Sequence, residues 1–269
     1  MSADGVHGVV SRVVQITDSH LFADPAECLQ GMPTSESLAA VVESVLAEQR
    51  DVRLLLATGD ISQDGSIESY RQFAAQVDAI GAPMRWLPGN HDEVPVLQEA
   101  TGSKDWAQPV FDLPGWKVLL LDSTIPGAVY GYLREDQLQL LENTLAAVTD
   151  SRVLVCLHHH PFPSGSRWLD RIGLHNMDEF FAVLDRFDNV GAVLWGHIHQ
   201  EMDRVRNGVR LLGSPSSCIQ FAPDSEDYSL DDRQPGYRWL DLHADGRIET
   251  GISRLQQPGW QVDLSGNGY

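Results

Sequence analysis

The sequence predicts an α/β protein in which two β-sheets are flanked by helices. Apolar runs of strand length alternate with segments whose apolar residues recur at helical spacing, an order typical of layered α/β architecture. The last part of the chain changes to short strands joined by turns, which indicates a second sheet packed face to face on the first. With 269 residues, of which 42% are hydrophobic, the chain is long enough for one large core.

The amino-terminal half is expected to alternate strands with helices. Residues 54–60, Leu-Leu-Leu-Ala-Thr-Gly-Asp, form an apolar run that ends at a Gly-Asp pair, as in a buried strand of a mostly parallel sheet. A similar strand is expected at 13–17, and a shorter one at 84–87. Apolar residues recur at helical spacing in 34–50 and in 66–80, so both segments are expected to be amphipathic helices.

The rest of the chain is expected to continue this alternation and then to change to hairpins. The predicted strands and helices of the middle part lie at residues 116–121, 135–148, 153–157, 176–187 and 191–195. Asn176 followed by Glu179 is typical of a capping box at the start of the last of these helices. The strands expected to finish the second sheet lie at 209–212, 237–242 and 247–253, with a turn at 244–246.

Composition limits the domain organisation and the class of partner. Without an internal linker or repeat, we expect one domain over residues 1–255 and a flexible tail at 256–269. The net charge of −19 disfavours a nucleic-acid-binding surface. No stretch approaches the roughly 20 apolar residues of a membrane span, so no membrane partner is expected. The sparse, odd set of Cys28, Cys156 and Cys218 and the absence of a signal-peptide pattern predict a cytoplasmic location.

Five predicted strand ends carry the same kinds of polar residue. Carboxylate, imidazole and amide oxygen suit divalent ions such as Mn, Fe or Zn, and no cysteine belongs to the set. Because carboxyl ends of parallel strands share one edge of a sheet, these side chains are expected to meet there. The five clusters are Asp18 with His20, Asp60, Asn90 with His91, His158 to His160, and His197 with His199.

The spacing within these clusters predicts a centre of two metal ions. In an extended segment, residues two apart point the same way, so Asp18 and His20 can converge on one ion. By the same reasoning, His197 and His199 can face one pocket. The two oxygens of the Asp60 carboxylate can reach both ions, which places the ions roughly 3.5–4 Å apart, as in two-metal hydrolases.

Each cluster taken alone has a structural interpretation. An isolated Asp18 or Asp60 would most often be a turn or cap residue, and a single histidine would be a hydrogen-bonded structural residue. Three adjacent histidines, 158–160, can form a surface cluster, and only one or two of them can face a metal because neighbours point apart. His175 and His243 lie outside the five clusters and are interpreted as structural. The metal hypothesis therefore depends on the whole set.

The motif series Asp-x-His, Gly-Asp, Gly-Asn-His-Asp, His-x-Pro and Gly-His-x-His resembles that of the calcineurin-like metallophosphoesterase superfamily, over residues 13 to about 255. The chain is similar, more narrowly, to bacterial class III cyclic-AMP phosphodiesterases. The resemblance implies a four-layer α/β/β/α sandwich of two mixed sheets flanked by helices. The segments that carry the narrower similarity are 16–22, 87–92, 158–163, 168–170, 196–201 and 215–221.

The resemblance also implies roles for individual residues. In the family the histidine ligand lies two residues before a proline, which selects His159, although the extra His158 remains a rival. His91 is implied to contact the phosphate and to protonate the leaving oxygen, with Asp92 orienting it. The implied ligands are Asp18, His20, His199 and Asp60 for the first ion, and Asn90, His197, His159 and Asp60 for the second. The implied substrate contacts are His20, Asn90, His91 and His199.

The function implied is hydrolysis of 3′,5′-cyclic AMP to 5′-AMP by a hydroxide that bridges two divalent ions, Mn or Fe, with Zn also permitted. Two alternatives keep the fold: a phosphodiesterase or phosphomonoesterase of broader specificity, and a catalytically inactive interaction module. The complete ligand set argues against the inactive module. Phe162, Arg167 and Trp168 are candidates for the base pocket, with loop packing as their structural interpretation. The sequence leaves the oligomeric state open.

Overall fold

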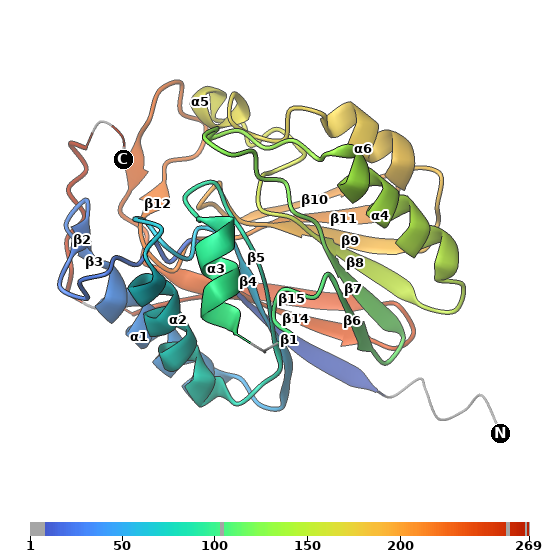
Figure 1. The fold of residues 1–269 in the computed structure, drawn as a ribbon, viewed down its shortest axis with the longest axis horizontal. Helices are drawn as coiled ribbons and strands as arrows, with labels where there is room; N and C mark the ends of the chain where they lie inside the picture. The colour runs from blue at the N-terminus through green and yellow to red at the C-terminus, as the bar shows by residue number, and fades with distance from the viewer. Residues whose placement is uncertain (1–8, 103–104, 257–258, 267, 269) are drawn as a thin grey trace.

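The computed structural model describes residues 9–102, 105–256, 259–266 and 268. It contains two β-sheets packed face to face, with helices on both outer faces (Figure 1). The predicted mixed α/β sandwich with flanking helices is therefore confirmed. No helix in the described ranges is long and apolar enough to cross a membrane.

The first sheet has five strands in the order β15-β14-β1-β4-β5. Strands β1, β4 and β5 are parallel, and β14 and β15 extend the sheet at the β1 edge through antiparallel pairing. The strands are β1 (Val10–Ile16), β4 (Val52–Thr58), β5 (Met84–Leu87), β14 (Gly236–His243) and β15 (Ile248–Arg254). The helices on its outer side are α1 (Thr34–Glu48), α2 (Ile67–Val77) with the 3-10 turn η2 (Asp78–Ile80), and α3 (Val94–Thr101).

The second sheet has six strands in the order β10-β11-β9-β8-β7-β6, with parallel pairing from β11 to β7. Its strands are β6 (Val110–Leu113), β7 (Trp116–Leu120), β8 (Arg152–Cys156), β9 (Val190–Trp195), β10 (Met202–Arg206) and β11 (Val209–Gly213). Its helices are α4 (Glu135–Ala147), α5 (Arg167–Asp170) and α6 (Met177–Leu184). Two small hairpins lie outside the sheets: β2 (Cys28–Leu29) with β3 (Met32–Pro33), and β12 (Gln220–Phe221) with β13 (Leu230–Asp231).

The two-residue periodicity of the strands builds three apolar layers. Along β1, Val13 faces the second sheet, whereas its neighbour Val14 faces the helices of the first sheet. In β4, Leu54 and Leu56 likewise point between the sheets, and Leu55 points to the helices. Because both faces of these strands are buried, they appear in the sequence as continuous apolar runs.

The prediction that the three late strands finish the second sheet is wrong for two of them. Strand β11 does join the second sheet, next to β9. Strand β14 instead pairs antiparallel with β1, placing Leu240 opposite Val13, and β15 pairs with β14. The alternation of apolar residues indicates a strand with one buried face, but the edge to which it adds depends on which backbone groups are left unpaired.

The capping box predicted at Asn176 does not form. Asn176 is the N-cap of α6, but its side chain makes no capping hydrogen bond. Its Oδ1 accepts from the Leu133 N–H at 2.9 Å, and its Nδ2 donates to Glu179 Oε2 at 3.1 Å. The side chain therefore ties the helix start to a neighbouring segment, a tertiary contact that local sequence does not reveal.

The predicted flexibility of residues 256–269 stays a prediction. Within the described part of this segment, Trp260 and Val262 pack against the helix side of the second sheet. The Asp263 N–H donates to the Gln30 carbonyl at 2.8 Å, so the segment contacts the β2–β3 turn.

A chain of buried polar side chains links the sheets within the apolar layer between them. The Ser214 hydroxyl donates to Gln15 Oε1 at 2.5 Å and accepts from Arg238 Nε at 3.0 Å. Gln15 Nε2 donates to Thr58 Oγ1 at 2.7 Å, and Arg238 Nη2 donates to the Gly213 carbonyl at 2.7 Å. Burial lowers the pKa of Arg238 to about 10, so the guanidinium stays charged at neutral pH. These directional bonds fix how the sheets lie on each other.

We expect Ser214→Ala to lower the free energy of unfolding by about 1–3 kcal/mol, because Gln15 and Arg238 would each lose a buried partner. Urea denaturation measures this loss. Ser44→Ala is the control, since the Ser44 hydroxyl donates to Glu48 on the surface of α1 and its removal should change stability by less than about 0.5 kcal/mol. Equal effects of the two substitutions would contradict a structural role for the buried chain.

Candidate metal centre

The predicted site residues lie on loops that follow the carboxyl ends of β1, β4, β5, β8 and β9. Most of them share an unusual backbone conformation. The φ angles are 55° at Asp18, 48° at His20, 47° at Asp60, 64° at His197 and 47° at His199. L-residues rarely adopt this left-handed region, and such strain is concentrated at functional sites. The pairs predicted to converge from extended segments thus converge through sharp left-handed turns instead.

Asp18, His20 and His199 form the first group of ligand-type side chains. His199 Nε2 lies 3.4 Å from Asp18 Oδ1 and 3.2 Å from His20 Nε2. On the far side of each ring, Nδ1 meets an oxygen acceptor, Gln63 Oε1 at 2.7 Å from His20 and the Ile219 carbonyl at 2.8 Å from His199. These acceptors select the tautomer in which both Nε2 lone pairs face the carboxylate, the form that binds a metal.

His158, Asn90 and His197 form a second group beside the first. His158 Nε2 lies 3.2 Å from Asn90 Oδ1, and its Nδ1 lies 2.8 Å from the Thr58 carbonyl. The His197 ring is 5.0 Å from the His158 ring, measured between centroids, and its Nε2 lies 3.1 Å from the Ile172 carbonyl. The remaining nitrogen, Nδ1 of His197, is therefore the one left to act as a ligand.

Asp60 connects the two groups. Its Oδ2 lies 3.2 Å from His158 Nε2 and 4.0 Å from His20 Nε2, while its Oδ1 accepts from the His91 N–H at 2.9 Å. The carboxylate is 1% exposed, so bulk water does not screen these contacts. This position is the one expected of a ligand shared by two ions.

The contacts of the two neighbouring histidines favour His158. A ligand-type atom of His159 also lies within 4.8 Å of those of His158 and His197, so the assignment of His159 as a ligand stays a prediction. His158 is the one whose Nε2 meets Asp60 and Asn90. His159 lies 2.8 Å from Ser123 Oγ through Nδ1 and 3.1 Å from the Val129 carbonyl through Nε2. Neighbours in a chain point apart, and the His-x-Pro spacing does not count the extra residue in this loop.

The charges of the site are those of a cation-binding centre. Burial lowers the pKa of His20 to about 3, and it holds the pKa values of His159 and His197 well below their usual range, so these rings are neutral. Burial opposes ionisation of Asp60, but the adjacent His158 holds its pKa well below the usual range. Burial also disfavours a charged His158, yet Asp60 raises its pKa to about 9. The site therefore favours positive charge between the carboxylates.

The donor set fits divalent metal ions. The groups comprise buried carboxylates and imidazoles and the half-buried amide of Asn90, which is the chemistry of Mn, Fe or Zn sites. Ligand-type atoms within each group of carboxylates and imidazoles lie within 4.8 Å of one another. The close approach of the loops also depends on glycine. A Cβ on Gly89 would lie 2.2 Å from Asp60 Oδ1, and one on Gly59 would lie 2.4 Å from His158 Nδ1. Larger residues at either position would displace a ligand.

Asp92 holds together the loops that carry Asp60 and His91. Its carboxylate accepts backbone N–H groups from Gly89 at 2.8 Å, Ser62 at 3.0 Å and Ile61 at 3.3 Å. Burial and the nearby charge of Asp60 raise the pKa of Asp92 to about 7. Direct orientation of the His91 ring by Asp92 stays a prediction; these contacts position the backbone on either side of it.

An aromatic pocket of about 190 Å³ opens beside the second group. Trp168, Phe221 and Tyr228 form one wall, with Asn90 and His91 at the metal side. Trp168, predicted from sequence, lines the pocket. Phe162 and Arg167 are not among the described residues that line it. Phe221 and Tyr228 were not predicted from the sequence as pocket residues. Phe221 lies in one of the segments that carry the family resemblance, and that was its only signal.

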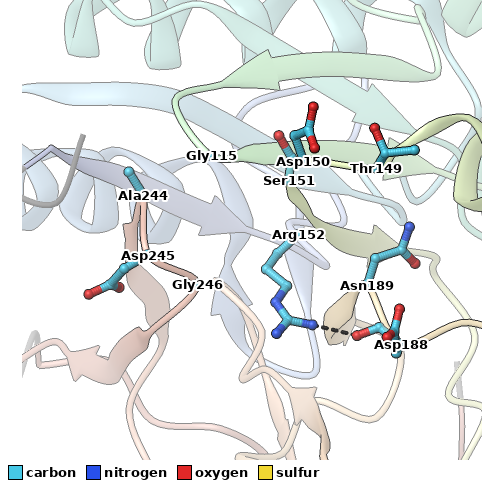
Figure 2. A pocket seen from close by; sticks show the side chains of 10 residues that line it. All are labelled: Gly115, Thr149, Asp150, Ser151, Arg152, Asp188, Asn189, Ala244, Asp245 and Gly246. Atoms are coloured by element: carbon cyan, nitrogen blue, oxygen red, sulfur yellow. Dashed lines mark hydrogen bonds between the residues drawn. The ribbon is translucent and has the colours of Figure 1, made fainter. Parts of the chain in front are cut away.

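A larger hollow, of about 360 Å³, lies far from this chemistry (Figure 2). It is formed at the amino ends of β7 and β8 and at the β14–β15 turn, by residues such as Gly115, Arg152 and Asp245. Arg152 donates there to the Asp188 carbonyl (Figure 2). None of the candidate metal ligands lines it, so its size does not make it the active site.

Two adjacent ligand groups on strand-end loops, sharing one carboxylate, define a metal-dependent hydrolase. The model of the calcineurin-like phosphoesterase family matches residues 11–201, and the chain belongs to that family.

Curated relatives cover nearly the whole chain. It is 51% identical over 257 residues to the 3′,5′-cyclic adenosine monophosphate phosphodiesterase CpdA of Pseudomonas aeruginosa, covering 96% of this chain and 94% of the relative. It is 45% identical over 262 residues to the enzyme of that name from Escherichia coli (strain K12), with the same coverage.

Solved structures share the fold. A dimetal phosphatase from Danio rerio has a TM-score of 0.62 at 18% identity, covering 91% of this chain and 98% of that one. A purple acid phosphatase from yellow lupin has a TM-score of 0.65 at 15% identity, covering 94% of this chain and 52% of that one. At these identities the likeness supports the architecture alone.

We expect His158→Ala to lose one of the two metal ions, because it removes the imidazole that meets both Asp60 and Asn90. His159→Ala, the matched control in the same loop, should keep both ions, since the His159 nitrogens face Ser123 and Val129. Elemental analysis of the purified variants, with circular dichroism to check folding, measures the difference. Loss of metal from His159→Ala alone would restore the sequence-based assignment.

Proposed function

We propose that this protein hydrolyses 3′,5′-cyclic AMP to 5′-AMP at a centre of two divalent metal ions. One observation carries the proposal: two ligand groups share the buried Asp60 and adjoin a pocket lined by aromatic side chains. The relatives named for cyclic-AMP hydrolysis are 45–51% identical over nearly the whole chain, which supports the same substrate here.

The chain's own residues would hold the ions in two sets. Asp18, His20 and His199 would bind one ion, Asn90, His158 and His197 the other, and Asp60 both. When bound, the ions supply Lewis-acid activation of water and neutralise charge that develops on the phosphoryl oxygens. Nitrogen and oxygen donors favour Mn or Fe and also permit Zn.

His91 is the proposed general acid. It lies on the loop after β5, half-buried at the mouth of the aromatic pocket, with its ring centroid 5.1 Å from that of His20. A proton on His91 would pass to the 3′ oxygen as its bond to phosphorus breaks, so the leaving group departs as a neutral hydroxyl. We expect Asn90, His20 and His199 to contact the phosphate as well.

The pocket wall suits a planar base. The Trp168 ring meets those of Phe221 and Tyr228 at centroid distances of 4.9 and 5.1 Å, and Trp168 Nε1 donates to Ser225 Oγ at 3.0 Å. Phe221 in turn stacks on His199 at 4.1 Å with an interplanar angle of 10°. A base bound against this cluster would be held at a fixed distance from the metal-binding residues.

The proposed partner is thus a small cyclic nucleotide, and the net charge of −19 supports the absence of a nucleic-acid partner. We keep the cytoplasm as the proposed compartment. Its support is that Cys28, Cys156 and Cys218 are all free thiols.

Metal-stripped protein should be inactive on cyclic AMP and regain activity with Mn²⁺ or Fe²⁺, whereas His91→Ala should bind both ions and lose about 10²–10⁴-fold in kcat. Steady-state kinetics and elemental analysis on the same samples separate the two roles. Metal loss in His91→Ala would contradict the division of labour. A higher kcat/KM for an aryl phosphodiester than for cyclic AMP in the wild type would favour the enzyme of broader specificity.

Trp168→Leu should raise the KM for cyclic AMP about tenfold with little change in metal content, because stacking on a base contributes about 1–3 kcal/mol. Phe162→Leu is the control: Phe162 packs against the same core cluster but is outside the described residues that line the pocket. A KM increase of the same size in both variants would show that the effect is structural.

A further inference from the structure

The carboxy-terminal segment reaches the proposed active site. Figure 1 shows the dark-red segment that includes residues 259–266 beside the β2–β3 hairpin. Gly268 lines the aromatic pocket together with Asn90, His91 and Trp168. The wall of the pocket thus combines residues of α5, β12 and the connecting loops with the backbone of Gly268.

The β2–β3 turn holds this segment through two hydrogen bonds, one from the backbone and one from the side chain of Gln30. The Gln30 carbonyl accepts from the Asp263 N–H at 2.8 Å, and Gln30 Nε2 donates to the Gly268 carbonyl at 2.9 Å. Farther back, Trp260 and Val262 pack against the core cluster that includes Leu29 of the same hairpin. The segment is therefore anchored before it reaches the pocket.

The approach of the segment to the turn is closer than a side chain would allow. Gly31 has φ of +81°, and a Cβ there would lie 2.9 Å from the Gln261 carbonyl oxygen, a backbone atom that cannot rotate away. A Cβ on Gly266 would lie 2.2 Å from Gln30 Oε1. Glycine at both positions permits the contact that places Gly268 at the pocket.

We propose that residues 259–266 and Gly268 form a specificity element, which limits the pocket to a compact cyclic mononucleotide and disfavours extended diaryl phosphodiesters. This inference rests on the proposed function for the identity of the favoured substrate. With Gly268 as part of its wall the pocket measures about 190 Å³. Small-molecule sites commonly measure about 300–1,000 Å³, so this pocket has room for one ring system beside the phosphate, and the second aryl group of an extended diester needs this wall to move.

The test weakens the anchor without touching a metal ligand. Gly31→Ala should push the Gln261 backbone away, and Gln30→Leu should remove the donor to Gly268. Gly81→Ala is the matched control, because Gly81 also has positive φ, +68°, but a Cβ added there would have no atom within 4 Å of it. It reproduces the backbone strain alone.

Three measurements are made on each full-length variant: metal content, the rate at which chymotrypsin cleaves after Trp260 or Leu264, and kcat/KM for cyclic AMP and for bis(p-nitrophenyl) phosphate. In Gly31→Ala and Gln30→Leu we expect faster cleavage and unchanged metal content. We also expect kcat/KM for the aryl diester to rise about fivefold or more, because that factor corresponds to the free energy of the one hydrogen bond that holds the wall. The control Gly81→Ala should match the wild type in cleavage and in selectivity.

Faster cleavage without a rise in kcat/KM for the aryl diester would overturn the inference. So would an equal rise in Gly81→Ala. Absence of cyclic-AMP turnover by the metal-loaded wild type would instead refute the proposed function. The aryl-diester comparison between variants remains a separate measure of the specificity element in that case.

Discussion

The Asp60 carboxylate, buried at the carboxyl end of β4, is the constraint on which the rest of the site depends. It can face two ligand groups only because the loops after β1, β4, β5 and β8 pack within hydrogen-bond distance of one another. That packing requires glycine on either side of the carboxylate, at 59 and 89, where a Cβ would collide with the site. The position of this one side chain therefore sets the geometry of the whole site, since moving Asp60 would separate the two ligand groups that it joins.

The strained backbone conformations at the site are held in place by hydrogen bonds between the loops and by the packing of the two sheets. Five candidate ligands have left-handed backbone, a conformation that persists only when the surroundings determine it fully. The Asp18 N–H donates to the Gly59 carbonyl and the His20 N–H to the Asp60 carbonyl, each at 3.0 Å, so neighbouring loops hold each other. Below them, the polar chain through Ser214 fixes the two sheets together. Ligand geometry is in this way set by the backbone before any ion binds.

Much of the fold and most of the site could be predicted from local pattern. Apolar runs placed β4 and β5 within about two residues, because a strand buried on both faces cannot be polar within its length. The position of β14 could not be predicted, because its apolar alternation fits either sheet and the open edge of β1 exists only in the folded protein. Helix α3 was missed, since its eight residues make only about two turns and bury just Leu97 and Thr101, too short a stretch for the helical period to be recognised.

The sequence by itself determined which residue types end each strand, and hence a nitrogen and oxygen donor set for divalent metals at the carboxyl ends of the strands. The tertiary structure turned His158 toward Asp60 and Asn90 and His159 toward Ser123 and Val129, because side-chain direction depends on the backbone angles of the loop and on the acceptors that surround each ring. It also brought Phe221, Tyr228 and Gly268 to one pocket. Residues so far apart in the chain share no local periodicity, and only the packing of the two sheets and their loops makes them neighbours.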